Sequence, residues 1–247
     1  MTSKAGWEQV GEAGAWKNTV VGVGVKGSLY TVESSGKLYA TSARTGGWDE
    51  VGSGYNTKFL AANGDYVYAI EADGSLYKVS PESGEWSRLG KKGDWKGTTA
   101  AVAIDGYLYT VDNHTLYYTD LSDGSWEVLG EEGTADDGWN TKFLFQDDGT
   151  LYSLETDGSI YEVDTDDGSW EEIGNAGDWK GTRTLATLKG HLYSVEESGV
   201  LYKTDLSTGR WEEYGTAADF GNTHLLFGTG KAVYSIERNG NLYKLDL

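Results

Sequence analysis

Short apolar runs separated by polar turn residues recur along the whole chain and predict β-strands. Within residues 138–163, the run TKFLF is apolar enough for a strand buried on both faces, whereas TLYSLE and SIYEVD combine tyrosine with aliphatic residues between glycine turns. A fourth strand-like run, SWEEIG, follows at residues 169–174. Because no run has the period of a helix, the pattern predicts a nearly all-β protein with antiparallel strands.

The four-strand unit occurs six times, and four kinds of marker residue agree on that count. A tryptophan begins one strand at Trp7, Trp48, Trp86, Trp126, Trp170 and Trp211, with spacings of 41, 38, 40, 44 and 41 residues. A threonine follows an aromatic residue at Thr19, Thr57, Thr98, Thr141, Thr182 and Thr223, and an acidic residue closes a strand at Glu33, Glu71, Asp112, Glu155, Glu196 and Glu237. Aliphatic–tyrosine pairs end at Tyr30 and Tyr39, Tyr68 and Tyr77, Tyr109 and Tyr117, Tyr152 and Tyr161, Tyr193 and Tyr202, and Tyr234 and Tyr243. Six such units predict an all-β, six-bladed β-propeller of four-stranded antiparallel blades, with a solenoid of stacked sheets as the competing geometry.

The two ends of the chain favour the propeller. The first unit begins with an unpaired WEQVG, and the last stops at LYKLDL without the strand that should follow. We therefore expect residues 7–11 to complete the last blade, residues 220–247, because this pairing removes an open sheet edge. The expected organisation is a single β-propeller domain over residues 1–247, closed by the N-terminal strand, with repeats ending near Trp48, Trp86, Trp126, Trp170 and Trp211.

A second period, twice as long, lies over the first. The units near Trp16, Trp95 and Trp179 share the sequence W-K-N/G-T, whereas those near Tyr55, Trp139 and Phe220 share N-T-K/H. The six blades therefore form a pseudo-threefold repeat of double blades.

Composition excludes several classes of partner. The 39 acidic and 20 basic residues leave a net charge of −19, which repels polyanions. We therefore expect no nucleic-acid binding, and no membrane insertion because no segment is apolar enough to span a bilayer. No export signal is visible, so we expect a soluble monomer that is cytoplasmic or released by a non-classical route.

Residues with catalytic or metal-binding chemistry form no recognisable pattern. The sequence has no cysteine, and His114, His191 and His224 occupy unrelated places in their units. The acidic run DTDDGS at residues 164–169 lacks the spacing of an EF-hand loop. We therefore expect no enzymatic activity, no metal and no cofactor.

The runs GWNTKFLF and DGTLYSLETDGSIYEV, together with the recurring W-x-x-x-G, resemble the repeat of the tachylectin-type β-propeller lectins and, more loosely, tectonin repeats. The resemblance covers essentially the whole chain and is best in the N-T-K/H units. It implies a multivalent lectin with pockets between adjacent blades. N-acetylated hexosamines are the implied ligand class, with glycans or glycoproteins as partners.

The residues themselves also suggest a sugar site, because pyranose recognition combines an aromatic face with a few fixed polar groups. The aromatic residue before each inner strand is a candidate stacking platform, and the asparagine after it is a candidate hydrogen-bonding group. The expected ligand-binding residues are Trp16, Tyr55, Asn56, Trp95, Trp139, Asn140, Trp179, Phe220 and Asn222, with Glu71, Glu155 and Glu237 of the acidic positions. Trp139 with Asn140 is the leading candidate.

Other interpretations remain open at this stage. The acidic residues either clasp lysine or backbone N–H groups or accept sugar hydroxyls, and the strand-opening tryptophans are expected to pack between blades. A non-enzymatic protein-interaction scaffold is the alternative function, because a propeller fold alone does not select a ligand.

Overall fold

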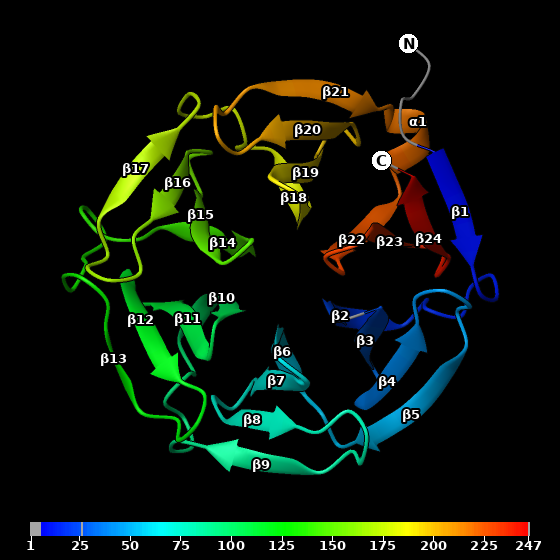
Figure 1. The fold of residues 1–247 in the computed structure, drawn as a ribbon, viewed down its shortest axis with the longest axis horizontal. Coiled ribbons are helices and arrows are strands. Elements are labelled where there is room, and N and C mark those ends of the chain that lie inside the picture. The colour runs from blue at the N-terminus through cyan, green and yellow to red at the C-terminus, as the bar shows by residue number, and fades with distance from the viewer. Residues whose placement is uncertain (1–5, 26, 247) are drawn as a thin grey trace. The chain divides into compact units, whose positions relative to one another are not determined.

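The computed structural model describes residues 6–25 and 27–246. These residues form six four-stranded antiparallel sheets, which confirms the predicted six-bladed β-propeller (Figure 1). Residues 1–5 and Leu247, which belong to the predicted domain and its last blade, lie outside the described part. The chain divides into two compact units, one of residues up to Tyr55 together with those from Gly181, the other Asn56–Lys180.

The first unit contains three sheets. One sheet has the order β2 (Thr19–Val25), β3 (Ser28–Glu33), β4 (Lys37–Ser42) and β5 (Trp48–Ser53). Another has the order β18 (Thr182–Leu188), β19 (His191–Glu196), β20 (Leu201–Asp205) and β21 (Trp211–Gly215). The third joins β22 (Thr223–Gly228), β23 (Val233–Glu237), β24 (Leu242–Asp246) and β1 (Gly6–Val10), and a short helix α1 (Ala217–Phe220) precedes it.

The second unit contains the other three sheets. The first has the order β6 (Thr57–Asn63), β7 (Tyr66–Glu71), β8 (Leu76–Val79) and β9 (Trp86–Leu89). The next has the order β10 (Thr98–Ile104), β11 (Tyr107–Asp112), β12 (Thr115–Asp120) and β13 (Trp126–Val128). The last has the order β14 (Thr141–Asp147), β15 (Thr150–Glu155), β16 (Ile160–Val163) and β17 (Trp170–Ile173). No helix in the described ranges is long and apolar enough to cross a membrane.

The N-terminal strand completes the last blade, as the sequence predicted. β1 pairs antiparallel with β24, so that Trp7 lies opposite Leu245 and Val10 lies opposite Leu242. The outer edge of β24 is therefore covered by a strand from the other end of the chain.

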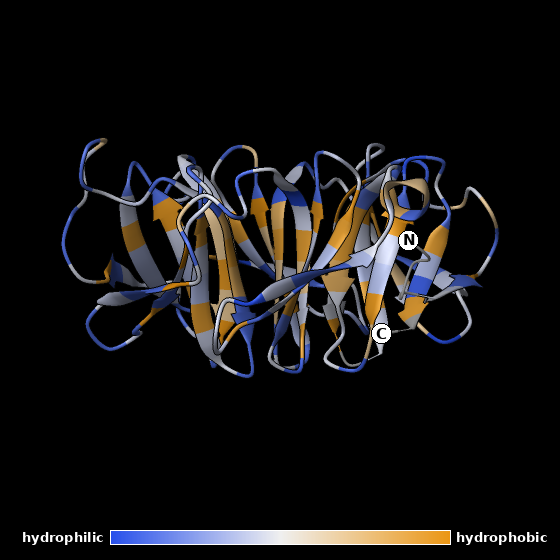
Figure 2. Cartoon of the chain, turned by 90° about the horizontal axis from the view of Figure 1, so that it is seen from above, coloured by the Kyte–Doolittle hydropathy of each residue, from blue (hydrophilic) through white to orange (hydrophobic). Residues whose placement is uncertain are grey.

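The aliphatic–tyrosine pairs build the core. The aliphatic member of every first pair is fully buried, at Leu29, Val67, Leu108, Leu151, Leu192 and Val233, and so is that of every second pair, at Leu38, Leu76, Leu116, Ile160, Leu201 and Leu242. Neighbouring residues of a strand point to opposite faces, so each tyrosine lies on the other side of its sheet. Figure 2 shows hydrophobic residues concentrated in the strands and hydrophilic residues in the loops.

Each innermost strand carries a β-bulge directly after its marker threonine. In β6, for example, Thr57 lies opposite Glu71, but the register shifts before Phe59, which lies opposite Ile70. The same shift occurs in β2, β10, β14, β18 and β22. A bulge re-aims the side chain beside it, and here it sets the threonine against the acidic residue that ends the next strand.

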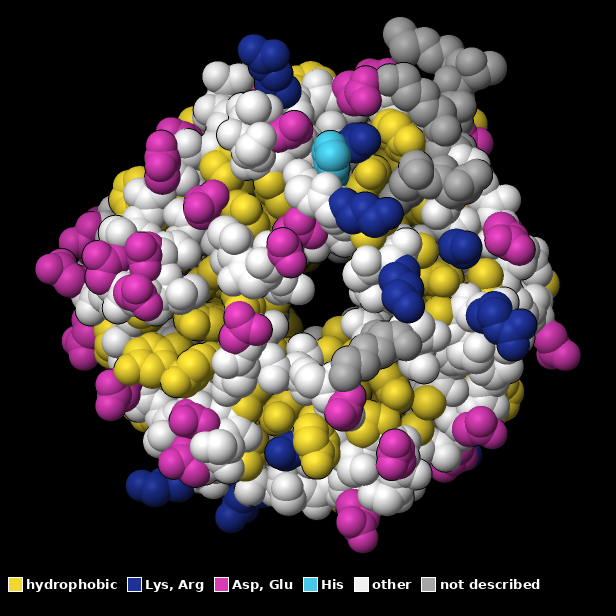
Figure 3. Space-filling model, viewed as in Figure 1, with side chains coloured by type: hydrophobic (Ala, Val, Ile, Leu, Met, Phe, Trp, Pro, Cys, Tyr) yellow, Lys and Arg dark blue, Asp and Glu magenta, His cyan; other side chains and the backbone are white. Residues whose placement is uncertain are grey.

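The surface carries the excess of negative charge. Acidic side chains are spread over the face shown in Figure 3. Two exposed ion pairs join Lys37 to Glu50 at 2.8 Å and Lys92 to Asp73 at 3.1 Å.

Candidate functional site

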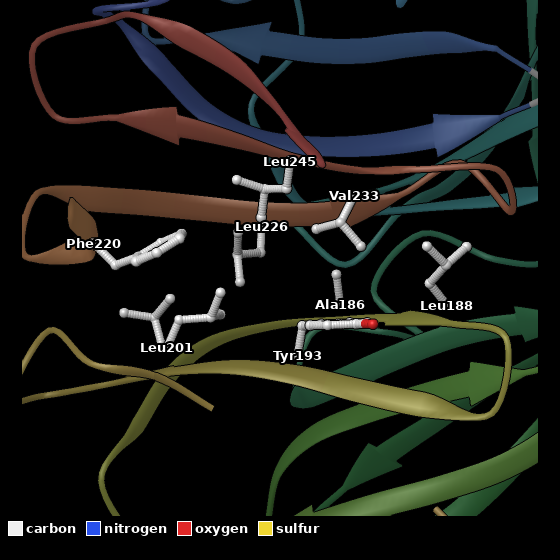
Figure 4. Packing of buried hydrophobic residues seen from close by; sticks show 9 residues of the cluster. Ala186, Leu188, Tyr193, Leu201, Phe220, Leu226, Val233 and Leu245 are labelled. Carbon is white, nitrogen blue, oxygen red and sulfur yellow. The ribbon is translucent and has the colours of Figure 1, made fainter. Parts of the chain in front are cut away.

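The structure buries most of the aromatic residues that precede the innermost strands. Trp16, Tyr55, Trp95, Trp179 and Phe220 are at most 5% exposed, and Trp139 is half-buried. Figure 4 shows Phe220 turned towards Leu201 of the neighbouring blade, in the same cluster as Leu226. The buried rings pack the blades and are not open stacking platforms, whereas Trp139 is partly exposed and partly packed against a core cluster.

The glycine of the W-x-x-x-G motif makes room for these rings. A Cβ atom at Gly11 would lie 2.6 Å from the ring of Trp16, and one at Gly90 would overlap the ring of Trp95. Real Cβ contacts are not this short, so any side chain at these glycines would displace the aromatic ring of the following loop. The motif is therefore explained by packing.

The asparagines of the aromatic-Asn-Thr step act through their backbone. The carbonyl oxygens of Asn56, Asn140 and Asn222 accept hydrogen bonds at 2.8–2.9 Å from the N–H groups of Ala72, Thr156 and Arg238. These bonds tie the loop before an inner strand to the turn after the next strand. All three asparagine side chains are exposed, and that of Asn140 donates to the carbonyl oxygen of Gly138 at 3.3 Å.

Five of the six acidic marker residues form a side-chain clasp with the bulged threonine. A threonine Oγ1 donates to a glutamate Oε1 in the pairs Thr19–Glu33, Thr57–Glu71, Thr141–Glu155, Thr182–Glu196 and Thr223–Glu237, at 2.5–2.8 Å. Glu71 also accepts the backbone N–H of Asn56. The clasp differs from the expected one, because its shared donor is the threonine hydroxyl and not a lysine, and a backbone N–H group joins it at Glu71.

Burial changes the ionisation of these glutamates. Desolvation is the largest cause and raises the pKa of Glu33, Glu155 and Glu237 above the ordinary value of 4.5. The hydrogen bonds from Thr19, Thr141 and Thr223 lower the pKa of their partners, but by less than desolvation raises it. In these three clasps burial therefore disfavours the charged form of the carboxyl group.

The third blade lacks this clasp. Asp112 replaces glutamate there and is one methylene group shorter, and the hydroxyl of Thr98 is buried without a hydrogen-bond partner among the described residues. Thr98 is 0% exposed, whereas Asp112 is half-buried.

The prediction that the strand-opening tryptophans pack between blades is wrong for five of the six. Trp48, Trp86, Trp126, Trp170 and Trp211 are 45–60% exposed. Each lies on the outermost strand of its sheet and meets the tyrosine of the next strand inward, as Trp48 meets Tyr39 with ring centroids 5.1 Å apart and planes 83° apart. Trp7 is the exception, because it is half-buried and packs against a cluster that combines residues of two neighbouring blades, such as Leu201 and Leu226.

Trp48 and Trp126 each border a pocket. The Trp48 pocket has a volume of about 190 Å³ and lies on the β2–β5 sheet. Its wall contains Ala15, Trp16, Asn18, Thr31, Glu33, Ser35, Tyr39, Thr41 and Trp48. The hydroxyls of Thr31 and Thr41 are buried and have no partner among the described residues.

The Trp126 pocket has the same construction in the second unit. It has a volume of about 200 Å³ and lies on the β10–β13 sheet, with Asp94, Trp95, Thr98, Thr110, Asp112, Tyr117, Thr119 and Trp126 in its wall. Tyr117 and Trp126 meet edge to face with centroids 5.4 Å apart. The indole N–H of Trp95 donates to Thr119 at 3.3 Å, which fixes the buried ring.

The pockets place the predicted residues in two groups. Trp16 and Trp95 are pocket walls, whereas Tyr55, Phe220 and the three asparagines do not line either pocket. Sequence reasoning missed the exposed Tyr–Trp pairs. Their signal was the polar sequence after each tryptophan, such as Trp170-Glu171-Glu172, which indicates a strand open to solvent on both faces.

Comparison with known proteins identifies the fold. The chain is similar to the crystal structure of a structural genomics protein of unknown function from Bacteroides thetaiotaomicron, with a TM-score of 0.70, 16% identity, and coverage of 98% of this chain and 76% of that one. It is also similar to YCF48 from Cyanidioschyzon merolae, with a TM-score of 0.57, 14% identity, and coverage of 96% and 98%. PorZ from Porphyromonas gingivalis has a TM-score of 0.56 at 13% identity, over 96% of this chain and 37% of that one. At these identities the likeness shows the fold alone.

No curated protein matches the chain significantly. The DUF6242 beta propeller domain matches residues 81–229, which is more than half of the sequence. The β-propeller part of the lectin resemblance is thereby supported. The chain belongs to the family of the DUF6242 beta propeller domain.

Proposed function

We propose that the protein binds carbohydrates without catalysing a reaction, and that the Trp48 and Trp126 pockets are its principal sites. The observation that carries the proposal is the repeated construction of the two pockets. Each combines an exposed tryptophan, an edge-on tyrosine, buried threonine hydroxyls and a carboxylate. This set supplies an aromatic face for the C–H side of a pyranose and polar groups for its hydroxyls.

The size of the pockets supports a single sugar ring as ligand. A cavity of about 150 Å³ admits benzene. Volumes of about 190 and 200 Å³ therefore leave room for one six-membered ring with its substituents. Two such sites on one chain would bind a branched glycan or a glycoprotein more tightly than either site binds a free sugar.

N-acetylated hexosamines are the first ligands to test, because the tachylectin-like repeat implies them. The Trp139–Asn140 step remains a second candidate position, since Trp139 is half-buried and the Asn140 side chain is exposed.

The test is an NMR titration of the tryptophan indole N–H signals with N-acetylglucosamine, N-acetylgalactosamine and glucose. Signals of Trp48 and Trp126 should shift, and Trp48→Ala or Trp126→Ala should each weaken binding at one pocket. Loss of a stacked ring should weaken binding about tenfold, or about 1.4 kcal/mol.

Trp170→Ala is the matched control, because Trp170 is equally exposed and pairs with Tyr161 but borders neither pocket. The double variant Trp139→Ala, Asn140→Ala tests the second position. Binding that survives both pocket variants and fails in the Trp139–Asn140 variant would move the site there. No shift with any sugar, together with no signal on a glycan array, would refute carbohydrate binding.

A protein-interaction scaffold is the alternative, and the exposed tryptophans favour it. Five tryptophans at 45–60% exposure are unusual for a surface without a partner, since tryptophan is enriched in interface hot spots. PorZ, one of the similar structures, is described as an essential bacterial surface component of a secretion system. A peptide array that shifts the indole signals where all sugars fail would support this alternative.

A further inference from the structure

The two pockets differ in their carboxylates. In the W-K-N/G-T loop, Asp94 of the Trp126 pocket stands where Ala15 stands in the Trp48 pocket. At the end of the second strand, Asp112 stands where Glu33 stands. The Trp126 pocket thus has two carboxylates in its wall and the Trp48 pocket has one.

The second difference is how far each carboxylate is already engaged. Glu33 accepts the hydroxyl of Thr19 at 2.7 Å, so part of its hydrogen-bonding capacity is used by the clasp. Asp112 has no such bond, and the Thr98 hydroxyl beside it is fully buried without a partner among the described residues. A buried unpaired hydroxyl is costly, and the other five blades avoid this cost through the clasp.

The carboxylate of Asp94 is hydrogen-bonded to the indole N–H of Trp126. Its Oδ2 accepts the backbone N–H of Lys91 at 3.0 Å and the indole N–H of Trp126 at 3.4 Å. The carboxylate is therefore held beside the Trp126 ring, in the wall of the pocket that also contains Asp112.

Two carboxylates with a tryptophan and a tyrosine are the chemistry that recognises an ammonium group. A cation is attracted to the face of an aromatic ring and forms strong hydrogen bonds with carboxylates. Two nearby cations are engaged elsewhere: Lys58 donates to the carbonyl oxygen of Thr98, and Lys92 pairs with Asp73 at 3.1 Å. Lys91 and Lys96 belong to the same loop as Asp94, but the wall of the pocket contains no lysine.

We propose that the Trp126 pocket selects amino sugars with a free ammonium group over their N-acetylated forms, whereas the Trp48 pocket does not, an inference that rests on the carbohydrate binding proposed above. The ring of the sugar lies against Trp126 and Tyr117, and its ammonium group donates to Asp112 and Asp94.

The experiment compares glucosamine, N-acetylglucosamine and glucose, at a pH where glucosamine is protonated, by their shifts of the Trp126 and Trp48 indole signals. The substitutions Trp126→Phe and Trp48→Phe assign the two signals. Glucosamine should bind the Trp126 pocket about tenfold more tightly than N-acetylglucosamine, because a charge-assisted hydrogen bond replaces a neutral one. The Trp48 pocket should show no such preference.

Three variants test the two carboxylates. Asp112→Asn keeps the shape of the side chain, and the other two introduce residues that this chain has at the equivalent positions of other blades. Asp112→Asn should abolish the preference, and Asp94→Ala, which copies Ala15, should reduce it. Asp112→Glu copies the other five blades and should reduce it by engaging the carboxylate with Thr98. A thermal melt and an amide spectrum of each variant show that the fold is kept.

The outcomes separate the two proposals. If neither indole responds to any sugar, the two pockets are refuted as sugar sites and this preference fails with them. If both sugars bind the Trp126 pocket equally, only the preference is overturned. If tetramethylammonium shifts the Trp126 signal as strongly as glucosamine does, the pocket is an ammonium site and its assignment to a sugar is overturned. Preferential glucosamine binding that Asp112→Asn removes supports the proposal.

Discussion

The ring of Trp7 stacks on the ring of Phe220, with centroids 4.3 Å apart and planes 24° apart. Trp7 belongs to β1, and Phe220 ends the helix that precedes β22 of the same blade. Trp7 also meets Tyr243 of β24 edge-on at 5.0 Å. Side-chain packing therefore reinforces the β1–β24 hydrogen bonds that join the two ends of the chain.

Removing this strand should destabilise the last blade. Deletion of residues up to Gly11 exposes the edge of β24, so we expect aggregation in size-exclusion chromatography and a large loss of stability in urea. The milder Trp7→Ala should cost about 2 kcal/mol, because a half-buried aromatic contact is lost. Trp170→Ala, at an exposed tryptophan, should change stability by less than about 0.5 kcal/mol. A monomeric truncated protein with an unchanged melt would contradict the closure by β1.

Gly90 should tolerate alanine far less than Gly106 does. Both have positive φ angles, of 59° and 93°, so backbone strain is common to the two substitutions. A Cβ at Gly106 meets nothing within 4 Å, whereas one at Gly90 overlaps Trp95. We expect about 1 kcal/mol of destabilisation for Gly106→Ala and about 3 kcal/mol for Gly90→Ala, measured by urea unfolding. Equal losses would show that the W-x-x-x-G glycine is required for its backbone angle alone.

The number of blades could be predicted because a local sequence pattern repeats six times. The closing strand could be predicted because one strand-like segment is left over at the start and one strand is missing at the end. The aliphatic–tyrosine pairs are separated by glycine turns, so every copy specifies the same hairpin, and the unpaired WEQVG has one place where a strand is missing. The side of each sheet on which an aromatic ring lies depends on packing instead. Trp95 and Trp126 are both tryptophans near strand ends, yet one is buried against Gly90 and the other is exposed.

The pockets could not be derived from the sequence for a related reason. The replacement of glutamate by Asp112 is visible, but its effect depends on the bulge that aims Thr98 at the carboxylate. The bulge follows the marker threonine in every blade, but a threonine beside an aromatic residue does not by itself predict a bulge. The Asn140 carbonyl oxygen, likewise, was not a foreseeable partner for the N–H of Thr156.

The threonine–glutamate clasp should contribute measurably to stability. Glu33→Asp shortens the side chain that accepts the Thr19 hydroxyl and should cost about 1 kcal/mol. Asp112→Glu should restore the missing bond to Thr98 and stabilise the protein by a similar amount. Urea unfolding of the two variants and the parent measures whether Glu33→Asp lowers the free energy of unfolding and Asp112→Glu raises it. A loss of stability in Asp112→Glu would show that the third blade has no room for the longer side chain.

The pH dependence follows from the buried glutamates. The pKa values of Glu33, Glu155 and Glu237 are raised in the folded protein above 4.5, so the folded state binds protons more tightly than the unfolded state does. Stability should therefore rise as the pH falls from neutral through these raised pKa values and level off below 4.5. Thermal melts across this range measure the change.

The opposite contribution comes from exposed aspartates with lowered pKa values, led by hydrogen bonds from their turns, as at Asp73 and Asp123. Their contribution to stability is lost only as the pH falls below the ordinary value of 3.8.

Glu237→Gln should make the rise in stability between neutral pH and 4.5 smaller, whereas Glu171→Gln, at an exposed position, should leave the Glu237 contribution intact. A pH profile unchanged by Glu237→Gln would contradict the assignment to that carboxyl.

Salt should stabilise the protein, because repulsion among its charges outweighs attraction. The net charge is −19, and the ion pairs Lys37–Glu50 and Lys92–Asp73 are both exposed, where such pairs contribute about 1 kcal/mol or less. Raising ionic strength from about 0.01 M to about 0.15 M shortens the Debye length from roughly 30 Å to roughly 8 Å, which screens repulsion between acidic side chains on different blades. We therefore expect the melting temperature to rise over this range, equally in sodium chloride and potassium chloride, and a melting temperature that falls would show that the ion pairs dominate.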